Sequence, residues 1–427
     1  MTVLHLPGRQ GPIDAVVPVP GSKSVANRAL VCAALAGGGE SRVTNVPGGD
    51  DCAAMMDALR TAGCLTVDGA VRGGVFPGPA TLFDAGLAGT TSRFLMAASS
   101  LSPSGVVIDG DDPLRRRPMA DLADALRRLG ATVEHTVSPG HLPLRVQGGP
   151  HVRGGHVGVR GDVSSQFISA LMLVAPRLAD GLVIAVDGTL VSRPYVEMTA
   201  SVMRAFGADA TVAADEVRVP PGGYAPTDYE VEPDFSSAAF PLMALAFTEG
   251  RVTVKGLRRA RLQGDSFVLE VARSMGLRVS DNGDDVVVER AAASRLAPVD
   301  VDLRDASDLV PAVAVACAAI DGTSTIRGVG FIRNKESDRI GDLVSCLRGI
   351  GAVAHETDDG LTIEGGRALE CRSAVPTHHD HRLAMAFSLP AAGGISIIIE
   401  DPSVVTKSWP GYFADMVGVL GPASTAN

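Results

Sequence analysis

Two kinds of helix alternate along the chain according to its pattern of apolar and polar positions. The first kind begins with small polar residues and continues with Ala, Leu, Met and Val, so its apolar residues cover more than one face. Its starts lie at residues 24–28, 91–95, 164–168, 236–240, 305–309 and 379–383. They recur at intervals of roughly 65 to 75 residues, which indicates six copies of one structural repeat.

The second kind of helix is amphipathic and supports the same repeat count. Its last turns lie at residues 57–60, 124–127, 201–204, 270–273, 345–348 and 415–418. Each leads within a turn to a glycine suited to the left-handed position that ends a helix, namely Gly63, Gly130, Gly207, Gly276, Gly351 or Gly421. Short β-rich runs lie between the helices, for example at residues 105–109, 182–186, 286–289 and 395–399. The pattern predicts an α/β protein of six β-α-β-α-β-β repeats.

Six repeats divide most naturally three and three. Proline marks two places where the chain could cross between domains, at residues 17–20 and 232–234. We therefore expect residues 20–231 to form an inserted lobe, and residues 1–19 and 232–427 to form a discontinuous lobe that includes the N-terminal strand. We expect the polar helix starts to face a cleft between the lobes, because converging helix N-termini attract anions.

Composition and charge narrow the class of protein. The chain has 427 residues, 46% of them hydrophobic and 20% charged, with a net charge of −10. The acidic balance argues against a nucleic-acid partner. Residues 1–19 lack the apolar core of a signal peptide, and no apolar run approaches the length of a membrane span, so we expect a cytoplasmic protein. The six cysteines form no C-x-x-C pair, which supports neither a zinc site nor a disulfide framework.

The stretch 20–28 has the composition of an anion site. It forms a turn followed by a Ser-rich helix start, in which Ser22 or Ser24 can cap free N–H groups beside the cations Lys23 and Arg28. Since Lys23 would be an exposed cation in a cleft, we expect it to add little to stability.

Several motifs in order along nearly the whole chain resemble those of the 5-enolpyruvylshikimate-3-phosphate synthases. They are residues 21–28, 87–93, 116–118, 164–167, 335–339 and 380–385, and Lys407 before Trp409. The resemblance implies a two-lobed, inside-out α/β barrel. It also implies transfer of the enolpyruvyl group of phosphoenolpyruvate to the 5-hydroxyl of shikimate 3-phosphate, with release of phosphate and without a metal or organic cofactor. We expect these small molecules as the only partners and a monomeric chain.

The resemblance also assigns roles to individual residues. The shikimate 3-phosphate contacts would be Ser24, Arg28, Ser164, Ser165, Gln166, Ser192 and Tyr195. The cage for phosphoenolpyruvate and phosphate would be Lys23, Gly89, Arg117, Lys335, Arg339, Arg382 and Lys407. Asp308 would be the base at the 5-hydroxyl, while Glu336 and Lys23 are candidates for proton exchange at C3 and at the bridging oxygen.

Two alternatives and three departures accompany this interpretation. UDP-N-acetylglucosamine enolpyruvyl transferases share the fold but usually carry a Cys in the loop at residues 111–117, which has none here. The other alternative is a non-catalytic repeat module that binds anions or RNA ends. The departures are Leu87 and Phe331, which replace common polar neighbours, and Phe94, which replaces a common Pro and is expected to change the packing of its helix. Adjacent histidines at 378, 379 and 381 would point to different helix faces, so we expect no metal there.

Overall fold

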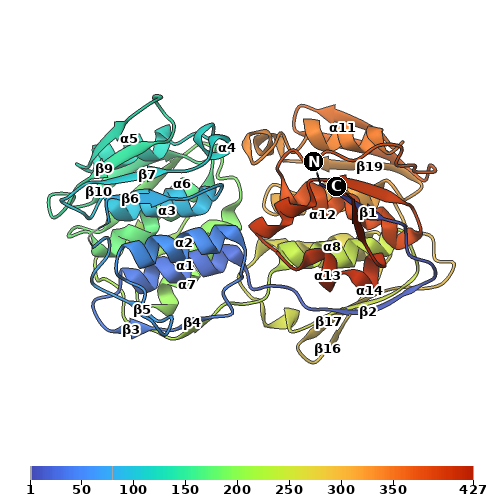
Figure 1. The fold of residues 1–427 in the computed structure, drawn as a ribbon. Coiled ribbons are helices and arrows are strands. Elements are labelled where there is room, and N and C mark those ends of the chain that lie inside the picture. The colour runs from blue at the N-terminus through green and yellow to red at the C-terminus, as the bar shows by residue number, and fades with distance from the viewer. Residues whose placement is uncertain (1, 79, 427) are drawn as a thin grey trace. The chain divides into compact units, whose positions relative to one another are not determined.

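The computed structural model describes residues 2–78 and 80–426, which form two compact units. The inserted unit comprises Gly21–Glu232, and the terminal unit combines Met1–Pro20 with Pro233–Asn427. In Figure 1 the inserted unit runs from blue to green and the terminal unit from yellow to red, together with the first strands of the chain. Each unit is built from helices and small sheets, as an α/β protein should be.

Four repeats have the predicted order of elements. One of these four takes its first strand from the start of the chain. In the inserted unit they are β6 (Leu82–Asp84), α3 (Gly89–Ser99), β7 (Val106–Asp109), α5 (Ala120–Arg128), β8 (Thr132–His135) and β9 (Leu144–Gln147), then β10 (Gly155–Arg160), α6 (Ser165–Val174), β11 (Leu182–Asp187), α7 (Arg193–Ala205), β12 (Thr211–Val212) and β13 (Glu216–Val219). In the terminal unit they are β2 (Ile13–Val17), α8 (Phe235–Met243), β15 (Gly250–Val254), α9 (Val268–Ser274), β16 (Arg278–Asn282) and β17 (Asp285–Arg290), then β18 (Asp300–Asp302), α10 (Val310–Cys317), β19 (Gly322–Arg327), α11 (Gly341–Gly349), β20 (Val353–Thr357) and β21 (Gly360–Gly365). Each of their sheets has the strand order first-second-fourth-third.

The other two repeats are assembled from distant parts of the chain. In the inserted unit, β14 (Tyr229–Glu230) pairs with β4 (Val43–Thr44) beside α1 (Lys23–Ala34), β3 (Glu40–Ser41), α2 (Asp50–Thr61) and β5 (Val71–Arg72). In the terminal unit, α12 (His381–Ser388), β22 (Ile397–Glu400), α13 (Tyr412–Asp415), α14 (Val417–Leu420) and β23 (Ser424–Ala426) are completed by β1 (Val3–Leu6). The strand β1 lies between β22 and β23 and is antiparallel to both, so the chain's two ends meet in one sheet (Figure 1). The repeat pattern is confirmed, but two of the six copies are composite.

The chain crosses between the units twice, and each crossing separates a strand from the helix that follows it. The strand β2 pairs in parallel with β15 of the terminal unit, although the next helix, α1, belongs to the inserted unit. Conversely, β14 pairs in parallel with β4 of the inserted unit, although α8 follows it. Each strand thus stays in the sheet of its own unit, while the helix that follows it in the chain belongs to the other unit.

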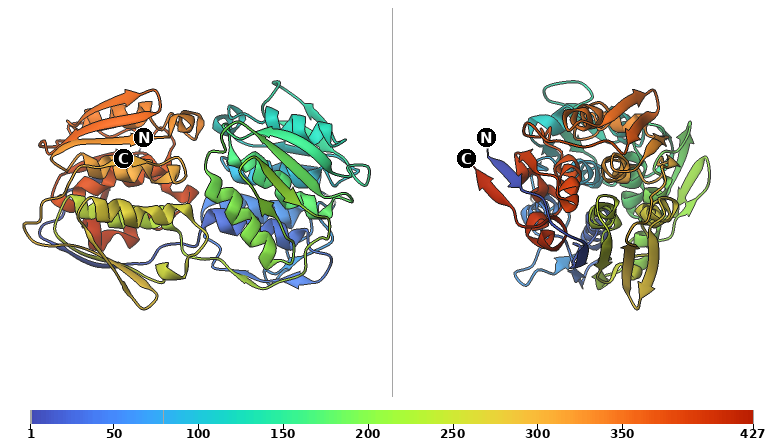
Figure 2. Two further views of the ribbon diagram at one scale, coloured as in Figure 1. Left: turned by 180° about the vertical axis from the view of Figure 1, so that it is seen from behind. Right: turned by 90° about the vertical axis from the view of Figure 1, so that its right-hand side faces the viewer.

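The first kind of helix is buried, as its composition predicts. All eight residues of α10 are buried, and in α6 and α8 nearly every residue is. Figure 2 shows such helices running through the interior of each unit with strands towards its outside. Ala and Val on every face allow these helices to pack closely without leaving cavities.

Glycine ends the second kind of helix as expected. The six glycines after these helices all have positive φ angles: Gly63 73°, Gly130 101°, Gly207 83°, Gly276 95°, Gly351 87° and Gly421 82°. Only glycine adopts this conformation without a steric cost, so the periodic glycines of the sequence are explained by the backbone.

A close approach of two backbones fixes the start of α1. A Cβ atom on Gly21 would lie 2.0 Å from the carbonyl oxygen of Asn45. A Cβ atom on Gly48, which follows Asn45 closely in the sequence, would meet no atom within 4 Å.

We therefore expect Gly21→Ala to destabilise the inserted unit by about 1–3 kcal/mol, because the added methyl group must displace backbone. Gly48→Ala is the matched control and should change the free energy of unfolding by less than about 0.5 kcal/mol. Urea denaturation followed by circular dichroism measures both. Equal stability of the two variants would show that the close approach is relieved at no cost.

Candidate functional site

The expected site residues divide between the two units, so each group is described within its own unit. Those in the inserted unit are Lys23, Ser24, Arg28, Gly89, Arg117, Ser164, Ser165, Gln166, Ser192 and Tyr195. Those in the terminal unit are Asp308, Lys335, Glu336, Arg339, Arg382 and Lys407.

Arg28 is a buried cation whose hydrogen-bond acceptors are neutral. Its side chain donates to Thr199 Oγ1 at 2.7 Å, Ser169 Oγ at 3.2 Å and the carbonyl oxygens of Ser24 at 2.7 Å and Tyr195 at 3.2 Å. Burial lowers the pKa of Arg28 to about 10, which still leaves the guanidinium charged at neutral pH. A buried positive charge held by neutral oxygens attracts an anion strongly, because little water screens it.

Phe94, one of the departures from the family pattern, contacts this cation. The guanidinium carbon of Arg28 lies 5.2 Å from the centre of the Phe94 ring and 6.0 Å from that of Tyr195. Phe94 therefore makes a cation–π contact, which helps to hold Arg28 in place.

A second buried arginine joins three segments that carry expected site residues. Arg93 donates to Gln166 Oε1 at 2.6 Å, to the carbonyl oxygen of Gly89 at 3.3 Å and to that of Pro118 at 3.2 Å. A Cβ atom on Gly89 would lie 2.4 Å from Arg117 Nη1, so only glycine allows Arg117 to approach the start of α3. Gly89, Arg117 and Gln166 are thereby brought together. Sequence reasoning quoted Arg93 within a motif but did not assign it to the site.

The helix starts are capped less regularly than the sequence predicts. Ser164 caps α6 by accepting a hydrogen bond from the backbone N–H of Gln166 at 3.3 Å. Ser22 occupies the N-cap position of α1, but its side chain makes no capping bond, and Ser24 lies inside the helix. The expectation that one of these two serines caps α1 is therefore wrong. Ser192 precedes α7 in a left-handed conformation, with φ at 54°.

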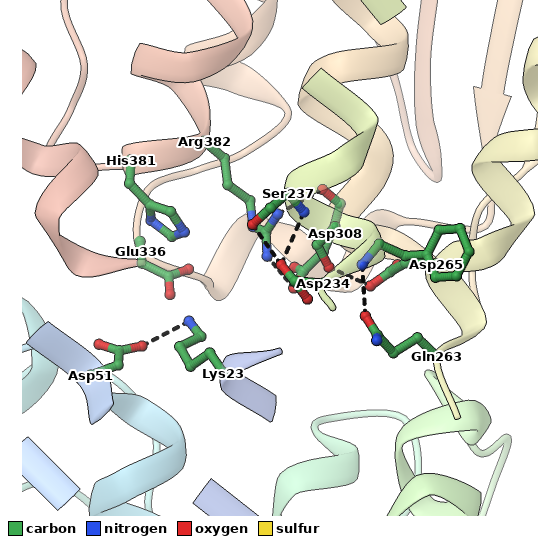
Figure 3. A network of polar contacts seen from close by, with 12 residues as sticks. Lys23, Asp51, Asp234, Ser237, Gln263, Asp265, Asp308, Glu336, His381 and Arg382 are labelled. Atoms are coloured by element: carbon green, nitrogen blue, oxygen red, sulfur yellow. Dashed lines mark hydrogen bonds and ion pairs between the residues drawn. The ribbon is translucent and has the colours of Figure 1, made fainter. Parts of the chain in front are cut away.

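Lys23 begins α1 and forms an ion pair with a residue that sequence reasoning missed. Its Nζ lies 2.7 Å from Asp51 Oδ2, and the two side chains are 18% and 3% exposed. Figure 3 shows this contact between the starts of α1 and α2. Lys23 is thus not the exposed, structurally neutral cation that we expected. Asp50 and Asp51 both lie in the first turn of α2, where acidic residues are favoured at any helix start. Their sequence position therefore does not indicate that Asp51 pairs with Lys23.

In the terminal unit, one buried guanidinium gathers three carboxylates. Arg339 donates from Nη1 to Asp308 at 2.9 Å, from Nη2 to Glu336 at 2.8 Å and from Nε to Asp380 at 2.6 Å. Its side chain is 2% exposed and that of Asp380 is fully buried. Burial opposes the charged form of Arg339, but the carboxylates of Asp380, Glu336 and Asp308 outweigh it and raise the pKa of Arg339 above its ordinary value.

Arg382 holds the same aspartate from another element. Its Nη2 lies 2.8 Å from Asp308 Oδ2, and its side chain is 6% exposed. Asp380 caps α12 by accepting from the backbone N–H of Arg382 at 2.9 Å (α12 and Arg382 are seen in Figure 3). Asp308, in the 3-10 turn η5 (Ser307–Leu309), is therefore held between two cations rather than capping a helix.

The two lysines of the terminal unit that were expected in the site lie at the ends of short 3-10 segments. Lys335 follows η6 (Gly330–Asn334), immediately before Glu336. Lys407 ends η8 (Pro402–Lys407) and is 3% exposed. Both lie on segments without a repeating apolar pattern, so only the motif pointed to them.

Residues 2–78 and 80–426 show no sign of a metal site or of a membrane-spanning helix. No group of three or more His, Cys, Asp or Glu side chains in these ranges is arranged to hold a metal ion. No helix of the same ranges is long and apolar enough to cross a membrane. The cysteines are free thiols, and all except Cys371 are buried.

Comparison with known proteins gives one consistent result. The model of the family described as EPSP synthase (3-phosphoshikimate 1-carboxyvinyltransferase) matches residues 8–416. A 3-phosphoshikimate 1-carboxyvinyltransferase of Edwardsiella ictaluri is 39% identical over 419 residues, covering 95% of this chain and 96% of the relative. A protein of the same name from Methanothermobacter thermautotrophicus is 38% identical over 409 residues, covering 95% of each chain.

Solved structures agree on the fold. An EPSP synthase of Acinetobacter baumannii superimposes with a TM-score of 0.82 at 25% identity, covering all of both chains. The enolpyruvyl transferase NikO of Streptomyces tendae gives a TM-score of 0.75 at 18% identity, covering all of this chain and 99% of the other, which is a likeness of fold alone. The two-lobed inside-out α/β fold predicted from the sequence is the fold of these structures.

The ion pair at Lys23 generates a prediction about stability. Lys23→Met removes the cation that the buried Asp51 carboxylate contacts, so we expect a loss of about 1–3 kcal/mol in the free energy of unfolding. The double variant Lys23→Met/Asp51→Asn removes the charge as well and should regain much of that loss. Thermal or urea unfolding measures both, and a single variant as stable as the original protein would mean that solvent replaces Lys23 at Asp51.

Proposed function

We infer that this chain, which belongs to the EPSP synthase (3-phosphoshikimate 1-carboxyvinyltransferase) family, transfers the enolpyruvyl group of phosphoenolpyruvate to the 5-hydroxyl of shikimate 3-phosphate and releases phosphate. The reaction is a step in the biosynthesis of chorismate and the aromatic amino acids. The observation that carries this inference is a family match over almost the whole chain that includes each of the charged residues described above.

The reaction brings several negative charges together, and the inserted unit supplies the means to offset them. We propose that shikimate 3-phosphate contacts the residues around the starts of α1, α6 and α7, namely Ser24, Arg28, Ser164, Ser165, Gln166, Ser192 and Tyr195. The hydroxyl groups and helix N-termini donate hydrogen bonds to phosphate, and Arg28 contributes a charge whose protein partners are all neutral.

Cations on both units, together with Gly89, would hold phosphoenolpyruvate and the departing phosphate. We assign this role to Lys23, Gly89, Arg117, Lys335, Arg339, Arg382 and Lys407. Arg117 approaches Gly89 closely because glycine has no Cβ atom. Arg339 and Arg382 both donate hydrogen bonds to Asp308. The assignment requires groups from both units, so variants on either unit should reduce turnover.

We propose that Asp308, Glu336 and Lys23 carry out the proton transfers. Asp308 takes the proton of the 5-hydroxyl as its oxygen bonds to C2 of phosphoenolpyruvate, while C3 gains a proton from Glu336 or Lys23. The tetrahedral intermediate then returns a proton from C3 to the group that supplied it as the C–O bond to phosphate breaks, and the departing phosphate oxygen takes up one proton, equivalent to the one that Asp308 removed from the hydroxyl. Because Arg339 contacts both Asp308 and Glu336, the charge that one gains and the other loses stays beside the same guanidinium.

The remaining proposals concern setting and partners. We propose that the chain acts in the cytoplasm as a monomer, on these two small molecules, without a metal or organic cofactor and without nucleic acid. The acidic net charge of −10 supports the last of these.

One assay tests the function directly. Phosphate release should require both phosphoenolpyruvate and shikimate 3-phosphate. Release with UDP-N-acetylglucosamine in place of shikimate 3-phosphate would instead assign the chain to the related transferases. Calorimetric binding of shikimate 3-phosphate without any phosphate release would point to a non-catalytic anion-binding module.

Asp308 generates the sharpest prediction about the mechanism. Asp308→Asn keeps the shape of the side chain but cannot accept a proton, so turnover should fall by about 10²-fold or more. Calorimetric affinity for shikimate 3-phosphate should change by less than about tenfold, since one hydrogen bond to a bound hydroxyl contributes little.

Asp321→Asn is the control, because this exposed aspartate lies in the same unit at the turn before β19. It should leave both quantities unchanged. If Asp308→Asn lost affinity as much as turnover, Asp308 would be a binding contact, and Glu336 would become the base.

A further inference from the structure

Asp265 is a buried carboxyl group for which neither the motifs nor the proposed mechanism has a use. It lies in the 3-10 segment η4 (Gly264–Phe267) and is 3% exposed. Its Oδ2 accepts a hydrogen bond of 2.5 Å from Ser236 Oγ, in the first turn of α8. An ionisable group is rarely buried so completely without a structural or chemical reason.

The segment that carries Asp265 is fixed to the start of α8 by further hydrogen bonds. Gln263 Oε1 accepts from the backbone N–H of Phe235 at 2.8 Å, and Gln263 Nε2 donates to the carbonyl oxygen of Pro233 at 2.7 Å. Asp234 caps α8 through the N–H and hydroxyl groups of Ser237, at 2.9 and 2.6 Å. Asp265 therefore has a defined position, as Figure 3 shows.

Three charged groups from other elements act on Asp265. They are Asp308 on η5, Asp234 at the cap of α8, and Arg382 on α12. Burial, together with Asp308 and Asp234, raises the pKa of Asp265 to about 7, while the Ser236 hydrogen bond and Arg382 act in the opposite direction. Asp265 thus changes its charge within the pH range in which enzymes usually work.

Asp308, in contrast to Asp265, lies beside positive charges. It is held by two guanidinium groups at 2.9 and 2.8 Å, and nearby positive charges favour the ionised form of a carboxylate and weaken it as a proton acceptor. A negative charge in the same cluster would restore some of that basicity. Asp265 is placed to supply it.

We propose that Asp265 is a positioning residue for the proton transfer at Asp308, whose carboxylate it makes a stronger proton acceptor by adding a negative charge to the cluster. The proton of the substrate hydroxyl goes to Asp308, and Asp265 does not exchange it. The role rests on the proposed function, since it assumes that Asp308 is the base.

The test compares the original enzyme with Asp265→Asn at saturating substrate from about pH 5.5 to 9. Substrate phosphates titrate near pH 6, but both enzymes share this effect, so it cancels in the ratio of their kcat values. We expect the ratio of original to variant to be near one below about pH 6 and to rise to roughly tenfold above about pH 8, while KM for each substrate stays within about twofold. A ratio that does not change with pH would overturn the proposal and leave Asp265 a purely structural residue.

Ser236→Ala is a second variant that keeps the carboxyl group. Because Ser236 stabilises the ionised form of Asp265, its removal should shift the rise in kcat towards higher pH without abolishing it. An unshifted pH profile in Ser236→Ala would contradict the proposal.

The pH dependence of protein stability reports the ionisation of Asp265 independently of catalysis. The folded protein keeps the Asp265 proton up to about pH 7, whereas the unfolded chain releases it near the ordinary value of 3.8. Ionisation of Asp265 therefore costs folded-state stability as the pH rises from about 4 to 7 and adds no further cost above. The melting temperature of Asp265→Asn minus that of the original protein should rise over this range and then level off, and a constant difference would overturn the proposal.

These measurements separate failure of this proposal from failure of the proposed function. Absence of phosphate release by the original chain overturns the function and, with it, the role of Asp265 in the reaction. Full activity of the original chain with a pH-independent kcat ratio overturns the role of Asp265 alone.

Discussion

The burial of Arg339 among carboxylates constrains the terminal unit more than any other interaction described here. A guanidinium with a 2% exposed side chain has lost nearly all its water, which costs several kcal/mol unless charged partners replace it. Asp308, Glu336 and Asp380 supply those partners from three separate segments. The segments can therefore shift only together, because moving one would leave a buried charge uncompensated.

The inserted unit also contains buried arginines, but their described hydrogen-bond acceptors differ from those of Arg339. Arg28 and Arg93 are as deeply buried as Arg339, but the contacts described for them are with hydroxyl, amide and carbonyl oxygens. The oxygen acceptors of Arg28 orient its guanidinium without neutralising it. The chain as a whole is acidic, so Arg28 concentrates positive charge locally within the inserted unit.

The sequence predicted the repeats well because their signals are local. Small polar residues before apolar runs and glycines after amphipathic runs reflect the backbone needs of single helices, and the positive φ angles at Gly63 through Gly421 show that these needs are real. The composite repeats could not be derived in the same way. The pairing of β1 with β22 and β23, and of β14 with β4, joins strands that are far apart in the sequence, and a local pattern that predicts a strand does not name its partner.

Within the site, the same distinction separates residues that were predicted from those that were missed. Arg339 and Arg382 were predicted as site residues because they belong to motifs, and Asp308 was assigned through the resemblance to the family. Asp51 and Asp265 were missed because only their contacts in the folded chain distinguish them. Asp51 forms an ion pair with Lys23 at 2.7 Å, and Asp265 accepts a hydrogen bond from Ser236 and interacts electrostatically with Asp308. Ser22 gave a false capping signal, since a serine at the N-cap position need not turn its hydroxyl towards the helix.

The chain crossings link these local sites to the fold. Lys23 begins α1 just after the first crossing, and Asp234 and Ser236 begin α8 just after the second. The two crossing segments run side by side, because Asp234 N–H donates to Pro20 O at 3.0 Å and Ser22 N–H donates to Glu232 O at 2.8 Å. The strands on the far side of each crossing are fixed in a sheet, which leaves the crossing little freedom to slide along its partner. Within the inserted unit, the start of α1 therefore follows a segment whose backbone is held by Glu232, and within the terminal unit, the start of α8 follows a segment whose backbone is held by Pro20.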